Sequence, residues 1–217
     1  MCIRILVADD HRLVREGIIS LLREEADMEV VGEASNGRQA VELAAKLTPD
    51  VVILDIAMPD LNGVDAARAI FSRLPKVRII ALTVHAEQRF VVNMLRAGAT
   101  GYLPKSSAFD ELTRAIRCVH SGKTYLSPIV AGPVLKDLLE RMGKEDAVPV
   151  SVLSLREREV LQLVAEGKAS KEVAKALHIS INTVIRHRQH VMDKLGVHGV
   201  AALTKYAIRE GLCGLEW

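Results

Sequence analysis

Several side chains able to do phosphoryl chemistry stand directly after short apolar runs of the sequence. These residues are Asp9, Asp10, Asp55, Thr83 and Lys105. Carboxylates that lie close together repel one another, and a divalent cation or a lysine relieves that repulsion. Oxygen ligands of this kind suit Mg²⁺, which phosphate oxygens also bind. The sequence therefore predicts a magnesium site that contains a carboxylate able to attack phosphorus.

Asp55 is the best-placed nucleophile. It follows the apolar run 51–54, and Met58-Pro59 and Asn62-Gly63 predict a sharp turn before the next helix. In an acyl phosphate on Asp55, the Lys105 ammonium would pair with one phosphoryl oxygen and the Thr83 hydroxyl would donate to another. Taken singly, an aspartate after a strand often caps a helix, and a lone lysine is usually solvated. Their recurrence at successive strand ends favours one common site.

The segments that must position these side chains alternate between strands and helices. Five apolar runs have strand length: 3–8, 30–34, 51–54, 77–82 and 101–103. The segments between them show helical periodicity. Continuous apolar runs without alternation are typical of strands buried on both faces. We therefore expect residues 1–122 to form an α/β domain with a doubly wound, five-stranded parallel sheet, whose ligands bind at the carboxyl ends of the strands.

The pattern changes after residue 122. Segment 123–150 contains three prolines and a charged stretch, which predicts a linker, with one short helix over 134–142. From 151 to 217 every segment is predicted to be helical, beginning with the capping-box spacing of Ser154 and Glu157. We expect a small all-α domain of four helices with a helix-turn-helix arrangement.

The third of these helices has a face that could read DNA. On a helical wheel Val184, Val191 and Leu195 share one side, which predicts the core face. The opposite side carries residue types that pair with base edges or touch a thymine methyl, and basic residues beside it suit phosphates or packing. The candidate DNA contacts are Asn182, Thr183, Ile185, Arg186, His187, Arg188, Gln189 and Lys194. A solvated helix face would show a similar polar pattern, and this alternative stays open.

Both parts of the chain resemble known bacterial domains. Asp9-Asp10, Thr83 and the stretches 55–63 and 98–105 are similar to the receiver domain of two-component response regulators, which has a flavodoxin-like fold. Residues within 155–174 and 180–197 are similar to the LuxR-type DNA-binding domain. Together they make the chain resemble a NarL/FixJ-type response regulator.

The resemblance implies roles for particular residues. A sensor histidine kinase would phosphorylate Asp55, and Mg²⁺ would be held by Asp9, Asp10, Asp55 and the backbone carbonyl of Ala57. On activation Thr83 would move toward the phosphoryl group and Tyr102 would turn inward. The phosphorylated form would bind a double-stranded DNA operator as a homodimer, with RNA polymerase as a possible further partner. We hypothesise that the unphosphorylated receiver shields the recognition helix or the dimer face.

Composition and charge agree with this interpretation. The chain is 49% hydrophobic and 26% charged, which excludes a disordered or collagen-like protein. Aromatic residues make up 3%, which argues against stacking platforms for single-stranded nucleic acid. Three separated cysteines, no apolar run of ~18 residues and no signal-peptide pattern predict a cytoplasmic protein without membrane attachment.

Two alternatives belong to other classes. A Mg²⁺-dependent phosphohydrolase could also use an aspartyl phosphate, but residue 57 is alanine where the haloacid-dehalogenase phosphatases carry an aspartate as general acid. We therefore expect that the chain is not an enzyme. The second alternative is a constitutive DNA-binding regulator whose receiver does not respond to phosphorylation.

Overall fold

The computed structural model describes residues 2–84, 88–107, 109–132 and 153–213. The first part contains β1 Ile3–Ala8, α1 Arg12–Leu22, β2 Met28–Ala34, α2 Gly37–Leu47, β3 Val51–Asp55, α3 Gly63–Arg73, β4 Arg78–Thr83, α4 Gln88–Arg96, β5 Gly101–Pro104, α5 Phe109–His120 and β6 Tyr125–Leu126. The second part contains α7 Leu155–Ala165, α8 Ser170–Ala176, α9 Ile181–Leu195 and α10 Val200–Arg209. None of the helices described in these ranges is both long and apolar enough to cross a membrane.

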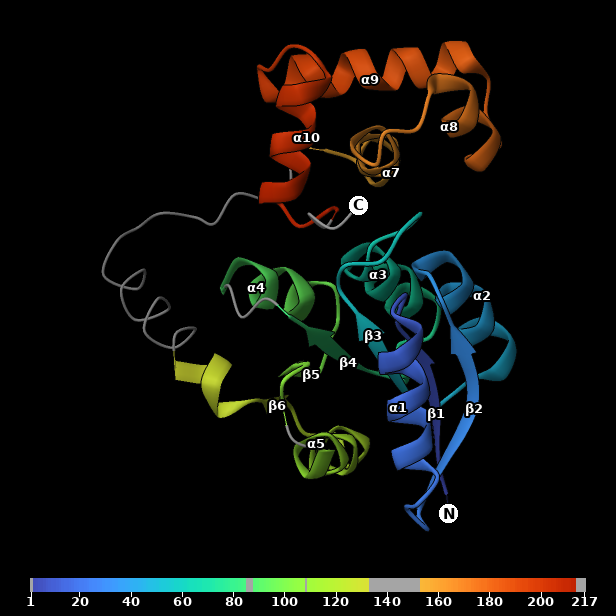
Figure 1. Ribbon diagram of the computed structural model, residues 1–217, viewed down its shortest axis with the longest axis vertical. Coiled ribbons are helices and arrows are strands. Elements are labelled where there is room, and N and C mark those ends of the chain that lie inside the picture. Colours follow the sequence, from blue (N-terminus) through green and yellow to red (C-terminus); the bar gives the residue numbers. More distant parts are fainter. Residues whose placement is uncertain (1, 85–87, 108, 133–152, 214–217) are drawn as a thin grey trace.

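The strands form one parallel sheet in the order β2-β1-β3-β4-β5-β6 (Figure 1). The strand order reverses between β1 and β3, which is where doubly wound sheets bind their ligands. The predicted doubly wound α/β fold is confirmed. Because all strands are parallel, the residues that follow β1, β3, β4 and β5 meet at one edge of the sheet.

The sheet has six strands where the sequence predicted five. The additional strand, β6, pairs with β5 through Gly101↔Tyr125 and Tyr102↔Leu126, and the Ser127 amide donates to the Tyr102 carbonyl at 3.0 Å. These residues lie in the segment expected to be a linker. A two-residue strand has no periodicity to recognise, since its pairing depends on the open edge of β5. The helix predicted over 134–142 lies outside the described residues.

Helices cover the sheet on both faces, as the continuous apolar strands predict. α2, α3 and α4 pack on one face, and α1 and α5 pack on the other (Figure 1). Residues Val51 to Leu54 of β3 have no exposed surface, and each such side chain contributes roughly 1.5–3 kcal/mol on burial. The most deeply buried strand therefore carries Asp55 at its end.

The second part folds around its own core, and its four predicted helices are confirmed. Ser154 and Glu157 form the predicted capping box: the Ser154 amide donates to Glu157 Oε2 at 2.8 Å, and the Glu157 amide donates to Ser154 Oγ at 3.3 Å. Ser180 caps α9 by accepting from the Thr183 amide at 3.1 Å. Val184 and Val191 of α9 lie in the core, as the helical wheel predicts.

Candidate functional site

The carboxyl edge of the sheet brings two carboxylates and one lysine into contact. Asp9 follows β1, Asp55 ends β3 and Lys105 follows β5. The Lys105 ammonium lies 2.7 Å from Asp55 Oδ2 and 2.8 Å from Asp9 Oδ2. Both carboxylates are 1% exposed, and a buried charge is stable only when it is paired in this way. The sequence predicted that these side chains lie at one edge of the sheet, and in the structure they form direct ion pairs.

The loop after β3 holds Asp55 in place. Asn62 caps α3 by accepting from the Asp65 amide at 3.0 Å, and the Gly63 amide donates to the Ile56 carbonyl at 2.9 Å. A Cβ atom at Gly63 would lie 2.0 Å from the Asp55 carbonyl oxygen. Only glycine therefore allows the start of α3 to pack directly on the end of β3.

The electrostatics of the site favour an additional cation. Burial raises the pKa of Asp55 to about 7, and the negative charge of Asp9 adds to this effect against the opposing charge of Lys105. Burial alone would lower the pKa of Lys105, but the charge and hydrogen bonds of Asp55 and Asp9 raise it. One lysine thus does not fully compensate the clustered carboxylates.

The donor atoms present fit a divalent cation. Asp9, Asp10, His11 and Asp55 each offer one ligand atom, and these atoms all lie within 4.8 Å of one another. Within the described residues, Asp10 Oδ1 and Asp55 Oδ1 are buried and have no hydrogen-bond partner. Oxygen atoms of this kind suit Mg²⁺. Ala57, whose backbone carbonyl was the fourth expected ligand, follows β3 by two residues and is half-buried.

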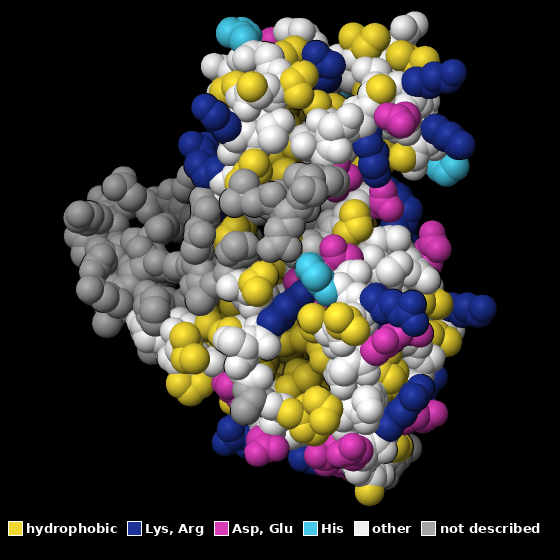
Figure 2. Space-filling view, viewed as in Figure 1, with side chains coloured by type: hydrophobic (Ala, Val, Ile, Leu, Met, Phe, Trp, Pro, Cys, Tyr) yellow, Lys and Arg dark blue, Asp and Glu magenta, His cyan; other side chains and the backbone are white. Residues whose placement is uncertain are grey.

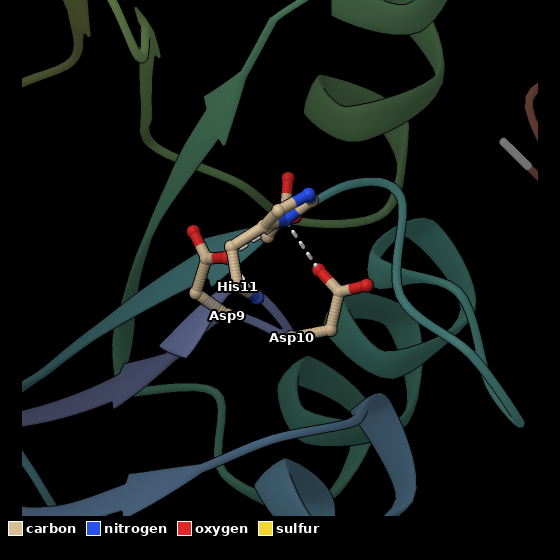
Figure 3. Close-up of side chains that lie close together, drawn as sticks. Asp9, Asp10 and His11 are labelled. Atoms are coloured by element: carbon tan, nitrogen blue, oxygen red, sulfur yellow. Dashed lines mark hydrogen bonds and ion pairs between the residues drawn. The ribbon is translucent and has the colours of Figure 1, made fainter. Parts of the chain in front are cut away.

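His11 is a member of this cluster that the sequence argument did not include. Its Nδ1 atom lies 2.9 Å from Asp10 Oδ1 and 3.4 Å from Asp9 Oδ1 (Figure 3). Burial lowers the pKa of His11, but the negative charges of Asp10, Asp9 and Asp55 together outweigh it and the net shift is upward. The signal in the sequence was its position directly after Asp9-Asp10.

The two expected switch residues lie on neighbouring strands. Thr83 ends β4 and is 2% exposed, and Tyr102 on β5 is fully buried in the core beneath α2, α3 and α4. Thr83 pairs with Pro104 in the β4–β5 register, and the Lys105 amide donates to the Thr83 carbonyl at 2.6 Å. The Tyr102 side chain is thus part of the receiver core in this structure.

The second candidate site is the exposed face of α9. Asn182, Arg186 and Gln189 are exposed, Ile185 is 55% exposed, and His187 and Arg188 are half-buried beside them. In Figure 1, α9 lies on the side of its domain that faces away from the receiver part. Figure 2 shows Lys and Arg side chains projecting from several places on this domain.

Three of the predicted DNA contacts have partners within the domain: Gln189 Nε2 donates to Asp193 Oδ1 at 2.8 Å, on the same helix. Lys194 Nζ lies 2.7 Å from Glu157 Oε2, which joins α9 to α7. The Thr183 hydroxyl lies 2.8 Å from Ser180 Oγ at the start of α9. Lys194 therefore joins α9 to α7 and Thr183 supports the start of α9, whereas Asn182, Ile185, Arg186 and Gln189 are exposed on its open face.

A hydrogen-bonded contact joins the receiver part to α7. The Gln162 side chain is fully buried; its Oε1 accepts from the backbone amide and the side-chain amide of Asn62, both at 3.0 Å, and its Nε2 donates to the Met58 carbonyl at 3.1 Å. Ion pairs flank this contact: Arg158–Asp65 at 3.0 Å and Lys168–Asp60 at 2.6 Å. We call Gln162, Arg158 and Lys168, with the 58–65 segment that they contact, the docking contact.

The docking contact bears on the shielding hypothesis. If the receiver covered the recognition helix, α9 would pack against it. The residues of the docking contact instead belong to α7 and to the turn after it, and α9 keeps its polar face exposed. Shielding of the recognition helix is therefore not the arrangement that this structure adopts.

The chain is similar to bacterial regulators over almost its whole length. Residues 5–117 match the family described as "Response regulator receiver domain", and residues 151–207 match "Bacterial regulatory proteins, luxR family". Response regulator UvrY of Escherichia coli (strain K12) is 38% identical over 214 residues, covering 99% of this chain and 97% of UvrY. Transcriptional regulatory protein LiaR of Bacillus subtilis (strain 168) is 40% identical over 210 residues, covering 97% of this chain and 99% of LiaR. A solved complex of the two-component response regulator RcsB with DNA has a TM-score of 0.58 and 31% identity, covering 95% of this chain and 98% of that chain.

Proposed function

Since the chain belongs to the NarL/FixJ-type response regulators, which combine a receiver domain with a LuxR-type DNA-binding domain and regulate transcription, we propose that phosphorylation of Asp55 controls its dimerisation and its sequence-specific binding to DNA. The observation that carries the proposal is the buried Asp55 carboxylate at the end of β3, 2.7 Å from the Lys105 ammonium. The receiver domain would span 1–122, the linker 123–150 and the DNA-binding domain 151–217.

The pocket residues have complementary roles in this reaction. An oxygen of the Asp55 carboxylate attacks phosphorus, so that a P–O bond forms while the bond from phosphorus to the donor's leaving atom breaks. Lys105 remains beside Asp55 and offsets the added negative charge, and the Thr83 hydroxyl donates to a phosphoryl oxygen. Mg²⁺, held by Asp9, Asp10, Asp55 and the Ala57 carbonyl, would neutralise charge on the transferred group. Tyr102 would be the second switch residue, responding to the position of Thr83.

The phosphodonor we propose is a sensor histidine kinase. A largely apolar hollow of about 240 Å³ lies between α1 and α5 and has Lys105 in its lining, and Figure 2 shows hydrophobic side chains in a hollow of the receiver part. Leu13, on the α1 side of the hollow, is 85% exposed. An apolar surface this close to the phosphoacceptor supports docking of a donor protein there.

The DNA-binding domain would read a double-stranded operator through α9. Asn182, Arg186 and Gln189 would contact base edges and Ile185 a thymine methyl, whereas His187, Arg188 and Lys194 would contact phosphates. Dimers would pair through α10. The solved RcsB structures, which include dimers bound to DNA, support DNA binding as a dimer. The site of action would be the cytoplasm, with RNA polymerase as a further partner at promoters.

The docking contact suggests how the two events are coupled. Its receiver residues lie in the segment 58–65, which begins three residues after Asp55. A phosphoryl group on Asp55 would change the charge beside this segment and loosen its contacts with α7. In the docked state α9 is exposed but fixed relative to the receiver. Release of the docking contact would allow the two DNA-binding domains of a dimer to match the spacing of their half-sites.

The test of the proposed function is the intact mass of the full chain after incubation with acetyl phosphate and Mg²⁺. We expect one added phosphoryl group on the wild type and none on Asp55→Asn, and tighter binding of operator DNA by the phosphorylated wild type. A wild type that gains no phosphoryl group from either acetyl phosphate or a kinase would favour the alternative, a constitutive DNA-binding regulator. Turnover of a phosphate ester would instead favour the phosphohydrolase.

A further inference from the structure

Arg15 reaches from α1 across the end of β1 to the backbone of the proposed magnesium site. Its Nη1 atom donates to the carbonyl of Asp9 at 2.7 Å, and its Nε atom donates to Glu33 Oε2 on β2 at 2.9 Å. The Arg15 side chain is 13% exposed, whereas that of Glu33 is 56% exposed. One planar guanidinium thus joins the end of β1 to β2 through two directed hydrogen bonds.

The carbonyl that Arg15 holds belongs to the peptide bond between Asp9 and Asp10. β1 and β2 pair as far as Ala8 and Ala34, and the Asp9 amide continues this pairing by donating to the Ala34 carbonyl at 3.1 Å. The pairing of β1 with β3 also ends at Ala8. Arg15 therefore supplies, at the Asp9 carbonyl, the kind of hydrogen bond that the sheet supplies before it. Because a peptide group is planar, the orientation of this carbonyl sets the direction in which Asp10 follows.

The two aspartates differ in how firmly the rest of the receiver holds them. Asp9 Oδ1 accepts from the His11 amide at 2.9 Å, and Asp9 Oδ2 lies 2.8 Å from the Lys105 ammonium. Asp10 lies between the end of β1 and the N-cap of α1, and its side chain is 29% exposed. The placement of Asp10 beside Asp9 thus depends on the peptide that Arg15 holds more than on burial.

We propose that Arg15 is a positioning residue of the cation site, which holds the Asp9–Asp10 peptide so that both carboxylates stay together as Mg²⁺ ligands. The inference rests on the proposed function for the existence of that site and adds a residue that acts on it through another. Removal of a group that orients metal ligands typically weakens metal binding by about 10–100-fold.

Charge alone predicts the opposite effect. Arg15 is a cation beside a site for a cation, so the loss of its charge would by itself strengthen Mg²⁺ binding. A positioning role and a purely electrostatic role therefore differ in the sign of the change in affinity. The sign can be measured directly on the full chain.

The experiment is calorimetric titration of the unphosphorylated full chain with Mg²⁺. Arg15→Met keeps an apolar stem and removes both the donor and the charge, and we expect it to weaken Mg²⁺ binding by about 10-fold or more. Arg12→Met is the matched control, since it removes the same charge from the same helix. Arg12 is 80% exposed and pairs with Glu16, and we expect its substitution to change the affinity less than about 2-fold.

Arg15→Lys separates the position of the donor from its charge. Lysine keeps the charge but lacks the planar fork that bonds two groups at once, so we expect Mg²⁺ binding to weaken by about 3-fold or more. In both Arg15 variants, transfer from acetyl phosphate should need more Mg²⁺ to reach half its maximal rate. The rate at saturating Mg²⁺ should stay within about 2-fold of the wild-type rate, because the variants impair binding of the ion and not the transfer itself.

The outcomes separate the inference from the proposed function. If Arg15→Met bound Mg²⁺ as tightly as the wild type or more tightly, the positioning role would be overturned and the site would stand. Equal weakening by Arg12→Met would also overturn it, since the effect would then not belong to the Asp9 carbonyl. If Arg15→Met did not fold, wild-type affinity in Arg15→Lys would overturn the role by itself. A wild type that bound no Mg²⁺ would overturn both the site and the inference.

Discussion

Glu157 shows how one side chain can hold a helix start and a helix-helix contact together. Its carboxylate accepts a hydrogen bond from the Ser154 amide at 2.8 Å and forms an ion pair with Lys194 at 2.7 Å. Glu157 is only 4% exposed. Burial alone would raise the pKa of Glu157, but these partners outweigh it and lower the pKa to about 2. The charged form of Glu157 therefore stabilises the DNA-binding domain.

The lowered pKa predicts a pH-dependent contribution to stability. Because the folded-state pKa lies below the unfolded value of 4.5, the contribution is complete above about pH 4.5 and is lost as pH falls toward 2. We expect Glu157→Gln to lower the free energy of unfolding of this domain by about 1–3 kcal/mol at pH 7 and by clearly less at pH 3. Urea titrations at both pH values, followed by the amide resonances of α7, measure the difference.

Glu172 provides the matched control for Glu157. It occupies the equivalent position in the first turn of α8, where its carboxylate accepts from the Ala169 amide at 2.7 Å, but it is exposed. We expect Glu172→Gln to cost less than about 1 kcal/mol, with little dependence on pH in this range. If Glu157→Gln lowered the free energy of unfolding by the same amount at pH 7 and at pH 3, the stabilising role of the Glu157 charge would be contradicted.

Arg186 and Arg188 allow base reading to be distinguished from phosphate binding on α9. Arg186 is exposed on the face of α9 opposite the core, and Arg188 is half-buried at the edge of that face. We expect Arg186→Ala to weaken binding to the operator by about 1–3 kcal/mol and to relax its sequence preference. Arg188→Ala should weaken binding to all DNA sequences similarly. It should also reduce, by about 1, the slope of the logarithm of the binding constant against the logarithm of the salt concentration.

The measurement for both arginines is fluorescence anisotropy with operator and scrambled DNA at several salt concentrations. Arg73→Ala, at the end of α3 in the receiver, serves as the control and should change neither quantity. An Arg186→Ala variant that lost affinity for both DNAs to the same extent would assign Arg186 to the phosphates.

At the scale of elements, the close packing of α3 on β3 controls the phosphoacceptor. A methyl group at Gly63 would meet the Asp55 carbonyl oxygen at 2.0 Å, so Gly63→Ala must displace the helix start or the strand end. We expect a loss of roughly 1–3 kcal/mol in the free energy of unfolding and a slower transfer from acetyl phosphate. Thermal unfolding and intact-mass time courses measure these two effects.

Gly17 is the comparison for Gly63. It lies within α1, and an added Cβ would meet nothing within 4 Å. Gly17→Ala should therefore stabilise the receiver by about 0.5–1 kcal/mol, as alanine does in exposed helix positions. If both substitutions stabilised the protein, the contact between α3 and β3 would be looser than the structure indicates.

The elements differed in how far their sequences predicted them. Long apolar runs and capping residues predicted β1 to β5 and the four C-terminal helices, because burial on both faces and capping leave local signals. β6 escaped prediction because a strand of two residues depends on the edge that β5 offers. The cluster of Asp9, Asp55 and Lys105 followed from strand topology alone. The docking contact depends on tertiary placement, which no local pattern encodes, whereas His11 had a local signal in its position directly after Asp9-Asp10.

At the scale of the whole molecule, a small set of polar contacts joins the receiver part to α7. Gln162 is fully buried and bonds both to the backbone amide and to the side chain of Asn62, which is itself the cap of α3. The docking contact therefore joins the DNA-binding domain to the helix that packs on the phosphoacceptor strand. A buried polar contact of this kind is specific in geometry and is lost as a unit when one partner moves.

Gln162 is the position at which docking can be tested in the full chain. Gln162→Ala would leave the Asn62 amides and the Met58 carbonyl buried without their partner, at a cost of about 1–3 kcal/mol for each group. The docked state would then lose at least about tenfold in population relative to the undocked state. We expect the radius of gyration from small-angle scattering to rise, and unphosphorylated Gln162→Ala to bind operator nearly as tightly as the phosphorylated wild type. Gln39→Ala is the control, because among the described residues the Gln39 side chain accepts hydrogen bonds only within the receiver, from Ser35. It should change neither the radius of gyration nor the affinity for operator DNA. A folded Gln162→Ala variant with the wild-type radius of gyration would show that docking does not depend on this contact.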